Sequence, residues 1–93
     1  MGSDRIYVHY RVFPEDKLWV GECMELGIST SAETQDEVKK GIEEATQLYV
    51  DTLVEQGELS RVLRERGILI FAEGDMPREE VERRSVSVPA GAR

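Results

Sequence analysis

The sequence predicts an α+β domain in which a three-stranded antiparallel meander is followed by a long helix, a short helix and a fourth strand. Three patterns predict it: apolar residues alternate over residues 5–13, recur every three to four positions over residues 34–56, and form a continuous run at residues 68–72. A chain of 93 residues with 40% apolar content forms a single core. We assign residues 1–72 to this domain and residues 73–93 to a polar C-terminal tail, partly disordered or forming an edge strand.

The three strands of the meander are predicted at residues 5–13, 18–23 and 28–32. Pro14 and Asp16 indicate a four-residue turn after the first strand, since proline presets φ and aspartate tolerates turn conformations. This turn pairs Phe13 with Leu18. In that register the residues that share the core-facing side are Val8, Tyr10, Val12, Trp19, Gly21 and Cys23.

The long helix is predicted to begin at a capping box formed by Thr34 and Glu37 and to end before Gly57. Its apolar residues should form one stripe against the sheet: Val38, Ile42, Ala45, Leu48, Tyr49 and Leu53. Gly41 is expected where this helix passes close to the sheet. A short second helix around residues 59–63 should end at Gly67.

The apolar run at residues 68–72 is typical of a strand buried on both faces. A right-handed crossover would place it parallel to the first strand, which is then central between the second and fourth strands. Residues 85–88 could add an edge strand, but for this tail the composition favours disorder.

Helices on one side leave the opposite sheet face open, and we expect that face to form a partner or dimer interface. The alternative is that the C-terminal tail folds over it. The side chains predicted to contribute to the contact are Tyr7, His9, Arg11, Val20, Glu22 and Met24.

The residues predict no catalytic, metal or cofactor site. Cys23 is interpreted as a small core residue rather than a nucleophile, since His9, the sole histidine, lies on the other face. His9 opposite Glu22 is interpreted as a cross-strand pair rather than a catalytic pair or proton switch. Trp19 is interpreted as a core residue rather than a stacking platform.

The net charge of −7 disfavours nucleic-acid binding and weakly favours a basic partner. A single cysteine, no apolar run long enough to cross a bilayer and no signal-peptide pattern predict a cytoplasmic protein.

Two segments and a helix end resemble the HicB-like family of small antitoxin domains. The family typically reads aromatic-V-A-x-C-P-E-L, then a short strand, then T-x-E-E-A opening a helix that ends near L-Y. The matching residues here are Trp19-Val20-Gly21-Glu22-Cys23-Met24-Glu25-Leu26-Gly27-Ile28-Ser29-Thr30, Thr34-Gln35-Asp36-Glu37 and Leu48-Tyr49. The likeness covers roughly residues 5–72. Met24 replaces the common proline, Val38 replaces an alanine and Gly41 interrupts the helix.

The resemblance implies a degraded ribonuclease-H-like fold and a non-enzymatic antitoxin that neutralises a HicA-type toxin, a small basic protein that cleaves mRNA. It also implies a homo-oligomer, a dimer or tetramer. Complete HicB antitoxins carry a C-terminal DNA-binding module. Only four residues follow Pro89, so we expect no direct DNA binding.

Two other functions remain open at this point: a nucleic-acid enzyme or binder built on a ribonuclease-H-like core, and a homo-oligomeric scaffold without a toxin partner.

Overall fold

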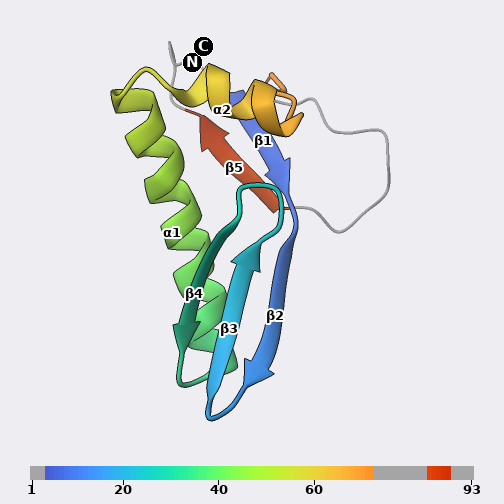
Figure 1. The fold of residues 1–93 in the computed structure, drawn as a ribbon, viewed down its shortest axis with the longest axis vertical. Coiled ribbons are helices and arrows are strands. Elements are labelled where there is room, and N and C mark those ends of the chain that lie inside the picture. Colours follow the sequence, from blue (N-terminus) through green and yellow to red (C-terminus); the bar gives the residue numbers. More distant parts are fainter. Residues whose placement is uncertain (1–3, 73–83, 89–93) are drawn as a thin grey trace.

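The computed structural model describes residues 4–72 and 84–88, which form two small antiparallel sheets, a long helix and a short helix (Figure 1). The predicted α+β class is confirmed. The larger sheet is a meander with the order β2-β3-β4, and α1 packs on one of its faces. The smaller sheet pairs β1 with β5. The elements are β1 (Asp4–Val8), β2 (Tyr10–Glu15), β3 (Leu18–Cys23), β4 (Ile28–Ala32), α1 (Gln35–Glu55), α2 (Leu59–Arg66) and β5 (Arg84–Val88).

The turn between β2 and β3 is shorter than predicted. Glu15 pairs with Leu18, so only Asp16 and Lys17 form the turn, and Asp16 adopts a left-handed φ of 55°. Phe13 therefore pairs with Val20 and not with Leu18. The predicted register is wrong by two residues. Because side chains alternate with a period of two, this shift leaves every residue of β2 and β3 on its predicted face.

The strand predicted at residues 5–13 is divided at His9. β1 pairs with β5, whereas β2 pairs with β3, so the two halves belong to different sheets. The backbone N–H of His9 donates to Glu25 Oε1 over 2.7 Å. A side chain thus takes the place of a ladder partner where the strand changes sheet.

The parallel fourth strand at residues 68–72 is not formed. Phe71 makes one isolated antiparallel bridge to Arg5, and Leu69 is 70% exposed. The strand that pairs in register with β1 is β5, and it is antiparallel. The first strand is therefore not central between the second strand and a parallel fourth one. A short apolar run does not by itself establish a buried strand, which explains the wrong prediction.

The preference for a disordered tail is also wrong for residues 84–88, which form β5. Val86 and Val88 pair with Ile6 and Asp4 and are buried in the core. The remaining tail, residues 73–83 and 89–93, lies outside the described residues.

α1 begins and ends where the sequence predicts. Thr34 is the N-cap and its hydroxyl accepts from the Glu37 N–H, while the same hydroxyl donates to the Glu37 carboxylate. At the other end Gly57 has φ 69°, and the N–H groups of Gly57 and Glu58 donate to the carbonyls of Val54 and Leu53. This is a Schellman motif, in which glycine avoids the steric cost of a left-handed residue.

The buried stripe of α1 differs in part from the prediction. Val38, Ile42 and Leu53 are buried, but Leu48 is 67% exposed, and Ala45 and Tyr49 are only half-buried. Thr46 and Val50 take their places in the core. The Thr46 hydroxyl donates to the Ile42 carbonyl within the helix, which satisfies a polar group that the apolar pattern excluded.

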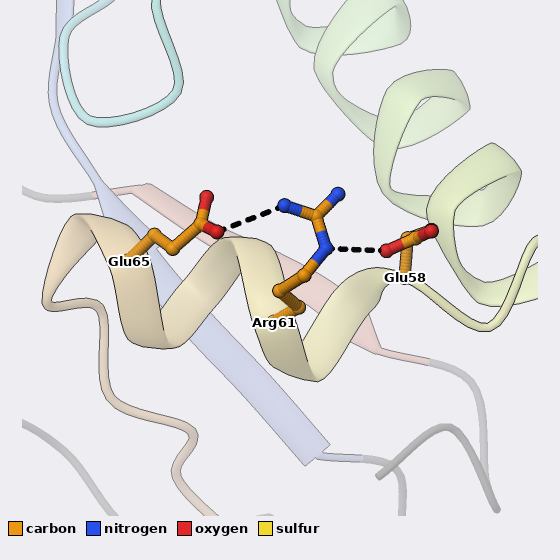
Figure 2. Close-up of polar contacts among 3 residues, drawn as sticks. All are labelled: Glu58, Arg61 and Glu65. Carbon is orange, nitrogen blue, oxygen red and sulfur yellow. Dashed lines mark hydrogen bonds and ion pairs between the residues drawn. The ribbon is translucent and has the colours of Figure 1, made fainter.

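α2 ends at Gly67 in a left-handed conformation, as predicted, and buries Leu59, Val62 and Leu63. On its outer side Arg61 bridges Glu58 and Glu65 (Figure 2). These hydrogen bonds raise the pKa of Arg61 above its ordinary value. The triad is solvent-exposed, so it contributes little to stability.

Candidate protein-binding face

The two faces of the β2-β3-β4 sheet differ in what covers them. Gly21 marks the face beneath α1: a Cβ at this position would lie 3.2 Å from both Ile42 Cβ and Val38 Cγ2. This is the close approach between helix and sheet that was predicted at Gly41. At Gly41 a Cβ would meet Thr30 Cγ2 at 3.8 Å, an ordinary contact. The closest packing therefore depends on a strand glycine.

The opposite sheet face, which we call the open face, carries Arg11, Phe13 and Glu15 from β2, Leu18, Val20 and Glu22 from β3, and Ser29 and Ser31 from β4. Phe13 pairs with Val20, and Arg11 pairs with Glu22 two residues further along each strand. The Arg11 guanidinium lies 4.4 Å from the centroid of the Phe13 ring and bonds Glu22 Oε1 through Nη2 at 2.8 Å and Nε at 3.0 Å. A half-buried apolar pair is therefore bordered by an ion pair.

Three of the six predicted interface residues are brought together on this face: Arg11, Val20 and Glu22. The Arg11 side chain is 58% exposed, so an incoming partner can reach it. Leu18, at the end of the same face, is 42% exposed. These features, an apolar centre with polar groups at its border, are typical of protein interfaces.

The other three predicted interface residues lie elsewhere. Tyr7 belongs to β1 and packs edge-to-face against Phe71, with ring centroids 5.5 Å apart. Met24 lies in the loop after β3, where its N–H donates to the His9 carbonyl over 2.9 Å. Tyr7 belongs to the other sheet because the strand divides at His9, and Met24 lies beyond the end of β3.

His9 is paired with Glu25 and not with Glu22, which corrects the predicted cross-strand pair. Nδ1 of His9 lies 2.5 Å from Glu25 Oε2, and the His9 N–H donates to Oε1 of the same carboxylate. One carboxylate therefore holds both the ring and the backbone of His9. The sequence did not predict the contact between His9 and Glu25, because this contact depends on the path of the loop after β3.

Cys23 and Trp19 were both predicted as core residues. Cys23 is 1% exposed, and burial raises the pKa of its thiol, which keeps it in the unreactive protonated form. Its predicted core role is confirmed. Trp19 is only half-buried, between Pro14 and Ala32 on the neighbouring strands.

A hollow of about 570 Å³ lies between α1 and the small sheet, lined among others by Tyr10, Glu43, Gln47 and Arg84. Burial raises the pKa of the Tyr10 phenol. Gln47 is already engaged here, through bonds to Ser87 and Asp51. The lining combines both charge signs without a pairing of catalytic groups.

Within residues 4–72 and 84–88, no group of three or more histidine, cysteine, aspartate or glutamate side chains is arranged to hold a metal ion. Neither helix in that part of the chain combines the length and hydropathy needed to cross a membrane.

Comparison with known proteins returned no match to this chain from family models, from curated proteins or from solved structures.

Proposed function

We propose that this chain is a non-enzymatic, antitoxin-like binding protein that neutralises a HicA-type toxin by direct protein contact in the cytoplasm. The resemblance at residues 19–30 and 34–37 supports the class of partner. The observation that carries the proposal is the open face: α1 packs on one side of the meander, and the opposite side presents Phe13 and Val20 beside an exposed Arg11.

Charge complementarity supports a basic partner. The chain has a net charge of −7, so its field attracts a positively charged protein and accelerates encounter. A toxin that cleaves mRNA needs a basic surface to hold the phosphate backbone. An acidic domain docked on that surface would exclude RNA by occupying the same site, and this inhibition requires no chemistry from the antitoxin.

Arg11 has a specific part in this proposal. Its guanidinium lies between the Phe13 ring and the Glu22 carboxylate, so its orientation is held before a partner arrives. A side chain that is already ordered loses less conformational entropy on binding. Arg11 can then bond an acidic or carbonyl group of the partner, while Phe13 and Val20 supply the apolar centre.

The test is binding of a catalytically inactive HicA-type toxin, measured by isothermal titration calorimetry with the full chain. The double variant Arg11→Glu/Val20→Glu should weaken binding at least about tenfold, or roughly 1.4 kcal/mol. Lys39→Glu, a charge reversal on an exposed position of α1, is the matched control and should bind like the native chain.

Equal binding by the double variant and the control would remove the open face as the toxin site. Failure of the native chain to bind any HicA-type toxin would remove the antitoxin function itself. Magnesium-dependent cleavage of an RNA–DNA hybrid by the purified chain would instead establish the ribonuclease-H-like enzyme.

A further inference from the structure

The sheets of the described residues have four outer strand edges, and three of them are closed or blunted. β1 is bridged by Phe71 through Arg5, and the edge of β5 is bonded by the Gln47 side chain at Ser87. β2 carries Pro14, which has no N–H to offer a further strand. The fourth edge, that of β4, carries none of these devices.

β4 has the sequence Ile-Ser-Thr-Ser-Ala, without a charged residue or proline. Native proteins usually protect a sheet edge with such residues, because an unpaired edge is a template for another strand. Figure 1 shows β4 at one edge of the meander, opposite β2, with α1 behind it. An unprotected edge of this kind is a candidate interface.

The direction of the backbone groups of β4 follows from the ladder. Met24 directs its N–H to His9, toward β2, so alternate residues of β3 (Cys23, Gly21 and Trp19) direct theirs toward β4. Their partners are Ile28, Thr30 and Ala32. Ser29 and Ser31 therefore point their N–H and C=O groups outward, and both residues are exposed.

The flank of α1 on the β4 side is only partly covered by the described residues. Gly41 lies near Thr30, whereas Gln47, on the other flank of the helix, reaches β5. One helical turn apart along the β4 flank are Gly41, half-buried Ala45 and the 67% exposed Leu48. Gly41 and Ala45 are small, so a second helix can approach closely at these two positions. Ala45 and Leu48, which the core does not fully bury, therefore lie on the same side of the fold as the outer edge of β4.

We propose that β4 pairs antiparallel with β4 of a second copy of this chain, about a two-fold axis at Thr30, so that the meander continues as a six-stranded sheet. In this register Ser29 and the partner's Ser31 face each other as a hydrogen-bonded pair, and Thr30 faces the partner's Thr30. The outward N–H and C=O groups of Ser29 and Ser31 then form hydrogen bonds with those of the second copy, in both copies.

Self-complementarity favours a second copy as the occupant. The pairs Ser29 with the partner's Ser31, Thr30 with the partner's Thr30, and Ile28 with the partner's Ala32 oppose no charges, and hydroxyl pairs of this kind are favourable. Glu33, the nearest carboxylate in the chain after β4, faces the partner's Gly27. Two acidic copies can therefore meet here without like charges directly opposed.

The arrangement has a consequence for the open face. A two-fold axis normal to the sheet keeps both α1 helices on one side and both open faces on the other. The dimer then presents two copies of Arg11 and Phe13 on one continuous surface. The interface uses the backbone N–H and C=O groups of Ser29 and Ser31, whereas the proposed toxin contact uses the side chains of Arg11, Phe13 and Val20, so neither contact depends on the other.

The first experiment measures the mass of the native chain in solution by light scattering, with Ser31→Pro and Ser31→Thr as variants. The native chain and Ser31→Thr, which keeps the N–H group, should have twice the monomer mass of 10.6 kDa. Ser31→Pro should have the monomer mass, with an unchanged circular dichroism spectrum, because the lost N–H points away from β3 and Pro14 occupies an equivalent position in β2.

A second variant makes the test independent of how Ser31→Pro folds. In a Cys23→Ala background, Thr30→Cys should form a disulfide-linked dimer under mild oxidation, because a non-hydrogen-bonded antiparallel pair brings the two thiols together. Ser29→Cys should link far more slowly, because Ser29 faces the partner's Ser31 and not Ser29.

A native chain that is monomeric, a folded Ser31→Pro variant that remains dimeric, or equal cross-linking at positions 29 and 30 would each overturn the β4 interface. Toxin binding by monomeric Ser31→Pro would leave the antitoxin proposal intact, so the two proposals fail separately.

Discussion

The side-chain amide of Gln47 pairs with the backbone of Ser87 as a neighbouring strand would. Its Nε2 donates to the Ser87 carbonyl over 2.9 Å, and its Oε1 accepts from the Ser87 N–H over 3.3 Å. The contact joins the middle of α1 to β5, which is separated from it by 40 residues in sequence. A side chain of α1 therefore pairs with the outer edge of β5, while the other edge of β5 pairs with β1.

Replacing Gln47 with methionine should lower the free energy of unfolding by about 1–3 kcal/mol, because the half-buried backbone groups of Ser87 lose their partner. Urea unfolding measures the loss, and amide exchange at Ser87 should accelerate. Gln56→Met, at an exposed position, is the control. An unchanged midpoint for Gln47→Met would show that water replaces the amide without loss.

The two glycines at the helix–sheet contact should respond in opposite directions to alanine. Gly21→Ala places a methyl group 3.2 Å from Ile42 and Val38, an overpacking that costs about 1–3 kcal/mol. Gly41→Ala has room beside Thr30 and should stabilise α1 by about 0.5–1 kcal/mol. Thermal unfolding of both variants provides the comparison. A destabilised Gly41→Ala would place the close approach at the helix glycine after all.

Glu25, the carboxylate in the loop after β3, should contribute to the stability of the fold. Glu25→Ala removes the acceptor of both the His9 ring and the His9 backbone N–H, and we expect a loss of about 1.5–3 kcal/mol in unfolding free energy. Glu33→Ala, which removes an exposed carboxylate, should have little effect. Denaturant unfolding distinguishes the two variants. Similar losses would mean that His9 is held by its strand alone.

Stability should decrease at alkaline pH. Burial raises the pKa of the Cys23 thiol above its ordinary value, so above about pH 9 the unfolded chain loses this proton before the folded chain does. The unfolded state then binds fewer protons, and the free energy of unfolding falls as pH rises. Cys23→Ala should reduce the slope. Tyr10, whose pKa is raised in the same direction, retains part of it. An equal slope in Cys23→Ala would exclude the thiol as its source.

Both helix ends were predictable because their signals are local. Thr34 and Glu37 cap α1 within one turn, and Gly57 and Gly67 end their helices through a left-handed φ that favours glycine. The faces of β2 and β3 were also predictable. Alternation assigns Arg11 and Val20 to one side in any register that differs by two residues.

The pairing of distant segments was not predictable in this way. Residues 68–72 and 84–88 both carry apolar residues, and only the packing of the whole core selects β5 as the partner of β1. Likewise, the apolar periodicity placed Leu48 in the buried stripe of α1 and left Thr46 out of it. The buried position is decided by the angle at which α1 crosses the sheet and by the hydroxyl bond to Ile42.

The sequence by itself determined the class of fold, the ends of both helices and the open face that Arg11, Val20 and Glu22 share, since each depends on neighbours within a few positions. The tertiary structure alone decided that His9 divides the first strand, that Glu25 holds it, and that the outer edge of β4 pairs with no other strand among the described residues. Those outcomes depend on which of several distant segments pairs with a given strand and packs in the core. Local sequence patterns do not determine that choice.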